Sequence, residues 1–250
     1  MLRALYNPFM RTLLLSDIHS NIEALKAVFA DAEREEPVER VLSLGDIVGY
    51  GPAPMACLEA LWDRHAVSIQ GNHDAAVAGT ISMADFNVYA AEAACWTTQR
   101  ISSDAAEYLR GLPDKLVDDS FLLVHGSPTG PLSNYITSYG QAAEAWEQTN
   151  SSDILVGHSH YQFAAEAGRG VEKPGPYGLT VPLGHARLVV NPGSVGQPRD
   201  NDSRAAYAIY NDETRVITMH RAWYDISATQ RAMAEGGLPE ALISRLALGR

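Results

Sequence analysis

The first seventy residues alternate short apolar runs with segments of helical periodicity. We predict strands over 12–15, 40–44 and 66–69, a helix from Ile22 to about Glu35, and a second helix over 55–62. Strand and helix in strict alternation are typical of an α/β sheet with parallel pairing. Ser20 and Glu23 stand at the S-x-x-E spacing of a capping box, so we expect the first helix to be capped there.

The remainder of the chain changes character twice. An Ala-rich section at 83–110 contains no strand pattern and predicts two helices, the second capped near Ser102 or Ser103 and closed by Gly111-Leu112-Pro113. Beyond it we predict further strands, a Gly/Pro-rich surface loop over 168–178 and a helical C-terminus. These strands are 121–124, 154–156, 187–190, 205–210 and 215–221, the last two forming a hairpin across Asn211-Asp212-Glu213.

Composition narrows the classes of function. The chain has 250 residues and a formal net charge of −11, which argues against a polymeric nucleic acid as partner. Its two cysteines, Cys57 and Cys95, form no disulfide pattern, and no apolar segment approaches the length of a signal peptide or membrane span. We therefore expect a single cytoplasmic domain over 1–250 with no membrane contact; the sequence leaves the oligomeric state open.

Polar side chains follow five of the predicted strands at the point where each strand ends. In open α/β sheets, sites form beyond the carboxyl ends of the strands, so these residues can converge. Carboxylate, imidazole and amide ligands without thiolate suit Zn, Mn or Fe. The motifs are D-x-H (Asp17, His19), G-D (Asp46), G-N-H-D (Asn72, His73, Asp74), H-G (His125) and G-H-x-H (His158, His160).

Each motif alone has an ordinary structural explanation. A single D-x-H or G-D after a strand is more often a cap or a satisfied core group than a metal ligand. In an extended chain His158 and His160 would share a face, but paired histidines also occur in other metal folds. A metallo-β-lactamase would carry Asp and His where Gln162 and Phe163 stand, so that fold is disfavoured. Amidohydrolase barrels are disfavoured too, because they place such a histidine pair on the first strand and this pair lies past the middle of the chain. All five motifs in order form a strong joint signal.

This ordered set resembles the calcineurin-like metallophosphoesterases. NPGSVGQPRD at 191–200 and the GDIVGYGPAP segment are similar to a compact bacterial phosphodiesterase branch that includes diadenosine-tetraphosphate hydrolases. The resemblance implies a two-sheet sandwich with helices on both outer faces, and two transition-metal ions (Mn, Fe or Zn). Asp17, His19 and His160 would hold the first ion, Asn72, His125 and His158 the second, and Asp46 would bridge both.

The resemblance also implies a reaction. A hydroxide bridging the metals would attack a phosphodiester or phosphoanhydride bond of a small, nucleotide-type substrate. His73 would donate to the phosphoryl oxygen or the leaving group, and Asp74 would orient His73. Beyond the metals we expect Arg199 to contact phosphate and Tyr50 to stack on a base, although both are also ordinary rim residues. The helical section at 83–110 is either a cap over the site or part of the outer helix layer.

Two other functions compete with the hydrolase. Some proteins of this fold, such as the retromer scaffold subunit, are binding platforms in which the histidine of the GNHD element is replaced. Here His73 is present and all seven ligand positions are filled, which favours an enzyme over a metal-binding scaffold for protein partners. A redox site with two histidines and one carboxylate would leave Asn72, His125 and one of the paired histidines unexplained.

Overall fold

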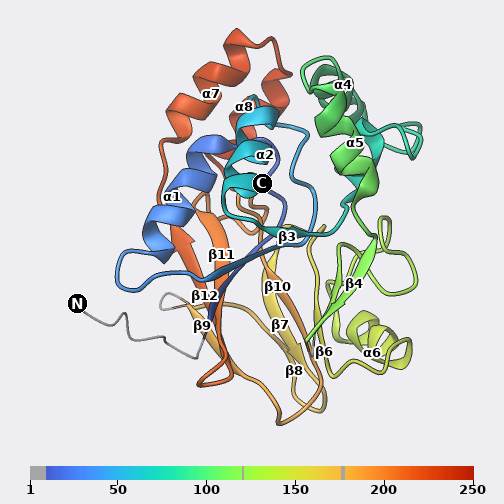
Figure 1. Cartoon of the computed structure of the whole chain (residues 1–250), viewed down its shortest axis with the longest axis vertical. Coiled ribbons are helices and arrows are strands. Elements are labelled where there is room, and N and C mark those ends of the chain that lie inside the picture. Colours follow the sequence, from blue (N-terminus) through green and yellow to red (C-terminus); the bar gives the residue numbers. More distant parts are fainter. Residues whose placement is uncertain (1–9, 120, 176–177) are drawn as a thin grey trace, which may run out of the picture.

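The computed structural model describes residues 10–119, 121–175 and 178–250. Two six-stranded sheets face each other, and helices lie outside them (Figure 1). The first sheet has the order β3 (Val67–Ser68), β2 (Arg40–Ser43), β1 (Arg11–Leu15), β11 (Ala205–Asn211), β12 (Val216–Ala222), β9 (Leu179–Pro182). The second has the order β4 (Lys115–Asp118), β5 (Phe121–Val124), β6 (Asp153–Leu155), β10 (Leu188–Pro192), β7 (Gln162–Glu166), β8 (Gly170–Glu172).

Strand β1 shows why the sheets pack as they do. Successive side chains of a strand point to opposite faces, and every residue from Leu13 to Leu15 is apolar and fully buried. Leu13 and Leu15 belong to the core beneath helices α1 (Ile22–Ala32) and α2 (Pro54–Asp63). Leu14 faces the other way and packs in the core shared with the second sheet. Continuous apolar runs therefore produce sheets that are covered on both faces.

The second sheet has its own helical cover. Helix α6 (Tyr139–Glu147) buries Ala142 and Trp146 against Val124 of β5 and Ile154 of β6. With α1 and α2 on the far side of the first sheet, the layers run helix, sheet, sheet, helix. The predicted four-layer α/β/β/α fold is confirmed.

The remaining helices gather at one end of the molecule (Figure 1). The section at 83–110 forms the two predicted helices, α4 (Val88–Thr98) and α5 (Ser103–Gly111), with Ser102 as the N-cap of α5. Helices α7 (Ile226–Glu235) and α8 (Glu240–Leu246) follow β12. Ala90 and Ala93 of α4, Met233 of α7 and Leu246 of α8 share one apolar cluster with Tyr50. This cluster joins the middle of the chain to its C-terminal helices. None of the helices in the described part of the chain is long and apolar enough to span a membrane.

Several local predictions were wrong. The N-cap of α1 is Asn21, whose side chain accepts a hydrogen bond from Ala24 N at 3.2 Å, and not Ser20. Ser20 has a φ of 55°, and its backbone nitrogen donates to Ile47 O in the loop after β2. The predicted loop over 168–178 contains edge strand β8, with 176–177 outside the described residues. Strands β4, β7 and β9 and helix α6 had no sequence prediction.

Candidate metal centre

Parallel strands bring the five motifs to one edge of the two sheets. Strand β1 lies between β2 and β11 and runs parallel to β2, which runs parallel to β3. Their ends deliver Asp17 and His19, then Asp46, and then the start of the short helix α3 (Asn72–Val77). In the second sheet β5 and β6 are parallel, and the loops after them carry His125 and the pair His158 and His160.

The loops that carry these side chains adopt an unusual backbone. Asp17, His19, Asp46, His158 and His160 all have φ between 48° and 64°, a left-handed conformation that few non-glycine residues adopt. The expectation that His158 and His160 share a face of an extended chain is therefore wrong. Strained backbone of this kind concentrates at functional sites, where the surrounding structure holds it in place.

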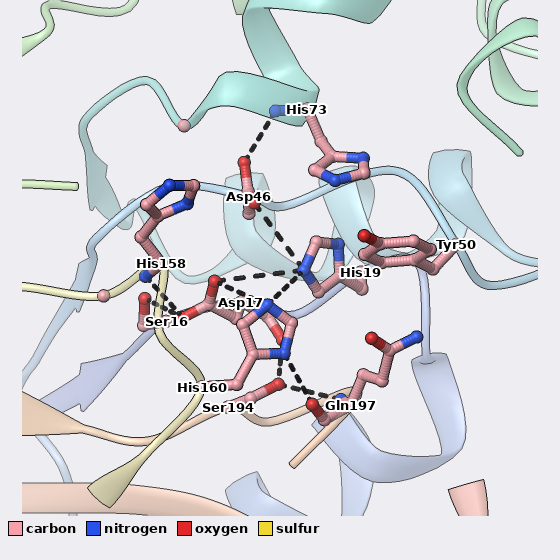
Figure 2. Close-up of polar contacts among 12 residues, drawn as sticks. Ser16, Asp17, His19, Asp46, Tyr50, His73, His158, His160, Ser194 and Gln197 are labelled. Carbon is pink, nitrogen blue, oxygen red and sulfur yellow. Dashed lines mark hydrogen bonds and ion pairs between the residues drawn. The ribbon is translucent and has the colours of Figure 1, made fainter. Parts of the chain in front are cut away.

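The side chains form two buried clusters that share Asp46. One contains Asp17, His19, Asp46 and His160, and the other contains Asp46, His125 and His158. Asp46 Oδ2 lies 3.6 Å from His19 Nε2 and 3.3 Å from His125 Nε2, so it faces both groups. Figure 2 shows His19, His160 and Asp17 converging below Asp46.

Asp17 has one oxygen that lacks a hydrogen-bond donor. Its Oδ2 accepts from Ser16 Oγ at 2.7 Å and from His158 N at 3.1 Å. Its Oδ1 is buried with no hydrogen-bond partner among the described residues and lies 3.2 Å from His160 Nε2. A buried carboxylate oxygen without a donor is costly, and a cation at this point would satisfy it.

The Nε2 lone pairs of His19, His125 and His160 point into the two clusters. His19 Nδ1 lies 3.1 Å from Val48 O, His125 Nδ1 2.7 Å from Leu44 O, and His160 Nδ1 2.5 Å from Gln197 O. A carbonyl oxygen only accepts, so each Nδ1 carries the proton and each Nε2 is left to bind a metal. His19 Nε2 and His160 Nε2 are only 3.1 Å apart. Facing lone pairs at that distance repel unless a cation is held beside them, so the donor set fits metal ions.

Comparisons with known proteins agree with this geometry. Residues 10–215 match the model of the calcineurin-like phosphoesterase superfamily domain. An uncharacterized protein of Methanocaldococcus jannaschii is 35% identical over 252 residues, which cover 95% of this chain and 97% of that protein. The chain belongs to the calcineurin-like phosphoesterase superfamily.

Solved structures extend the likeness to the whole fold. The crystal structure of a metallophosphoesterase from Sphaerobacter thermophilus has a TM-score of 0.87 and 39% identity, and the match covers 97% of this chain and 100% of that one. A hypothetical protein from Pyrococcus horikoshii OT3 has a TM-score of 0.82 at 23% identity, covering 96% and 99% of the two chains. The chain therefore combines the family fold with buried His/Asp clusters that suit a dinuclear metal site.

Burial favours the neutral form of most imidazoles of the centre. It lowers the pKa of His158 to about 3 and that of His19 and His160 well below the usual value. Burial also lowers the pKa of His125, but the Asp46 carboxylate beside its Nε2 outweighs burial and raises that pKa to about 9. Burial raises the pKa of Asp17 to about 7, and the Asp46 charge adds to the effect. Neutral imidazole is the form that binds metals.

Asn72 and His73 enter from the first turn of α3. Asn72 Oδ1 lies 3.2 Å from His125 Nε2, next to the second cluster. His73 N donates to Asp46 Oδ1 at 2.8 Å, which fixes the carboxylate. The His73 ring makes no hydrogen bond to the described residues; its centroid lies 4.4 Å from that of Tyr50 and 4.9 Å from that of Phe86.

Asp74 does not orient His73, and that prediction was wrong. Its Oδ1 accepts from Val48 N at 3.1 Å and its Oδ2 accepts from Gly71 N at 3.0 Å. Both oxygens are thus used to fasten the loop after β2 to the start of α3. Asp74 supports the backbone around Asp46 and His73 and makes no hydrogen bond to the imidazole among the described residues.

A cavity of about 450 Å³ opens onto both clusters. Arg199 lies in its wall, where Nη2 donates to Gln197 Oε1 at 3.1 Å and lies 3.4 Å from Tyr50 Oη, while Nε has no partner among the described residues. Tyr50 also lines the cavity but is only 5% exposed, with its ring against His19 and His73. Tyr50 therefore has no open face on which a base could stack, and that interpretation was wrong.

Two further parts of the chain complete the wall, and one of them belongs to the section at 83–110 for which a cap over the site was one of two alternatives. The segment before and into α4 contributes Ile81, Ser82, Asp85, Phe86, Asn87 and Ala90. The loop after β5 contributes Leu132, Ser133 and Tyr135. The sequence did not single out these wall residues, because they lie outside the short motifs that follow the strands.

Proposed function

We propose that the protein is a dinuclear metal-dependent hydrolase of phosphodiester or phosphoanhydride bonds in a small, nucleotide-type substrate. The observation that carries this proposal is the pair of buried clusters that share Asp46 and open onto one cavity. The similarity of NPGSVGQPRD to the compact phosphodiesterase branch supports this choice of bond, and the segment also holds the site: Ser194 Oγ donates to Asp17 O at 2.8 Å, and Gln197 O accepts from His160.

Two Mn, Fe or Zn ions would be held by the residues of the two clusters together with Asn72. When bound, such ions supply positive charge for the phosphate group and make water a strong nucleophile near neutral pH. The chain itself holds the ligand side chains in fixed orientations. Backbone carbonyls hold the imidazoles of His19, His125 and His160, and the His73 backbone holds Asp46.

Arg199 and His73 would act on the substrate in different ways, the first through its charge and the second as a hydrogen-bond or proton donor. The Arg199 guanidinium carries permanent positive charge into a protein of net charge −11, so it attracts and orients the phosphate. The His73 ring lies in the cavity wall without a competing hydrogen-bond partner among the described residues. It is available to donate to a phosphoryl oxygen or to protonate the leaving oxygen.

Turnover of bis-p-nitrophenyl phosphate and of the monoester, measured with Mn²⁺, tests this proposal. We expect diester hydrolysis that a chelator abolishes and that His73→Ala lowers by about 10²–10⁴-fold. His65→Ala is the matched control, because His65 lies in the turn after α2 and takes no part in the cavity wall. Full turnover of the His73→Ala variant on an ester with a poor leaving group would overturn the role of His73.

The alternative function is a metal-binding scaffold for protein partners. It predicts that both metals bind while neither ester is hydrolysed. Metal content measured on the same samples separates that outcome from simple loss of the ions. A screen of cyclic nucleotides and dinucleoside polyphosphates then identifies the bond that is cleaved.

A further inference from the structure

Tyr135 stands over one of the metal-site histidines. Its ring is stacked on the His158 imidazole, with a centroid distance of 4.0 Å and an interplanar angle of 9°. Although one face of the ring is covered in this way, the residue is 47% exposed and lines the cavity. The accessible surface of Tyr135 therefore includes the ring face turned away from His158.

The other aromatic rings of the cavity are placed differently. Phe86 lies beside His73, with 4.9 Å between ring centroids, and Tyr50 is almost fully buried. His158 and His73 lie on either side of Asp46 in Figure 2; the Tyr135 ring stacks on the first of these imidazoles and the Phe86 ring lies beside the second. Of these rings, Tyr135 offers the open, flat surface nearest the second cluster.

We propose that Tyr135 is a stacking platform for a nucleobase attached to the phosphate that binds at the metal clusters. The proposal rests on the hydrolase function and names the part of the substrate that gives specificity. Stacking of a base on an aromatic ring is favourable and tolerant of base identity. The imidazole behind Tyr135 holds the ring in one orientation, which reduces the freedom lost when a base stacks on it.

Polar groups in the wall of the same cavity suit the edge of a base. Ser133 is two residues from Tyr135 and offers a hydroxyl that donates and accepts. Asp85 lines the same cavity, and its carboxylate accepts hydrogen bonds from amino groups. A cavity of about 450 Å³ lies in the range of small-molecule sites and has room for a mononucleotide unit.

Calorimetric binding of AMP and of ribose 5-phosphate tests the proposal. The two ligands share the phosphate and the sugar and differ by the base. Measurements use Mn²⁺-loaded protein that carries His73→Ala, so that neither ligand is consumed. Tyr135→Ala and Tyr135→Phe are compared in this background with Tyr89→Ala, a tyrosine that is 46% exposed and does not line the cavity.

We expect AMP to bind at least about tenfold more tightly than ribose 5-phosphate. Tyr135→Ala should bring the two affinities within about threefold of each other, while Tyr135→Phe and Tyr89→Ala keep the difference. Equal affinities in the starting protein, or a difference that survives Tyr135→Ala, would overturn the proposal. Base-dependent binding without ester turnover by the unsubstituted protein would support Tyr135 as a platform while refuting hydrolysis. Ester turnover with equal affinities would do the reverse.

Discussion

At the scale of one residue, Asp17 shows that the metal centre lowers the stability of the metal-free protein. Its Oδ1 is buried without a donor and lies 3.2 Å from a histidine nitrogen that also carries a lone pair. Its backbone is left-handed, with a φ of 51°. The site is therefore complementary to a cation and unfavourable without one.

Asp17→Asn should stabilise the metal-free protein and weaken metal binding. An amide nitrogen at the Oδ1 position would donate to His160 Nε2, and the remaining oxygen would still accept from Ser16 and from His158 N. We expect a gain of about 1–3 kcal/mol in the free energy of unfolding, measured by urea denaturation in chelator. Asp85→Asn, at an exposed carboxylate, is the control and should change stability little. A less stable Asp17→Asn protein would contradict this explanation.

Residues of the centre were predictable where a short motif follows a strand, and unpredictable elsewhere. Asp17, Asp46 and His125 each follow a strand that is apolar enough to recognise. The two clusters group these residues as the family resemblance implies, including the shared Asp46. Tyr135 reaches His158 across a long stretch of chain, and no local pattern encodes such a contact. The role of Asp74 was predicted wrongly because the motif indicates that Asp74 lies near the site but not which groups it hydrogen-bonds.

Among the elements, the edge strands β4, β8 and β9 were missed, whereas the edge strand β3 was predicted and the buried strand β7 was not. Strand β5 is buried at all four positions and its bounds, Phe121–Val124, agree with the prediction. Strands β4 and β8 lie at the sheet edges with exposed and half-buried residues, so their apolar pattern is weak. Helix α6 was missed because it is short and its buried face consists of only Ala142, Ala145 and Trp146.

Gly157 controls how closely β6 and the loop after β1 approach each other. A Cβ at this position would lie 1.9 Å from Ser16 Oγ and 3.0 Å from Asp17 Oδ2. We expect Gly157→Ala to push Ser16 away from Asp17, to lower stability by about 1–3 kcal/mol and to weaken metal binding. Urea denaturation and metal content after dialysis measure both effects.

Gly140 provides the matched control for that substitution. It lies in helix α6, and nothing approaches its Cβ position within 4 Å. Gly140→Ala should therefore raise stability by about 0.4–1 kcal/mol and leave metal content unchanged. If both alanine variants retained full metal content and equal stability, close packing at Gly157 would not be what shapes the site.

At the scale of the whole molecule, the metal centre joins two sheets that also meet through their shared core and through polar contacts such as the Arg40–Asp118 ion pair. Asp17, His19 and Asp46 come from loops of the first sheet, whereas His125, His158 and His160 come from loops of the second. Each cluster contains residues from both sheets. Metal ions bound here would connect the two layers, so metal binding and global stability should be linked.

Metal addition should therefore stabilise the entire fold. Ions that bind the folded chain and not the unfolded one raise the free energy of unfolding by about 2.7 kcal/mol at 100 times their dissociation constant. Thermal unfolding of chelated and Mn²⁺-loaded protein measures this, with one cooperative transition moving to higher temperature. Loss of either half of the centre should reduce the shift, so Asp17→Asn from the first sheet and His158→Ala from the second are compared. A shift that persisted in both variants would place the stabilising ions elsewhere. Equal melting temperatures with and without bound metal would show that the two sheets do not depend on the ions for their association.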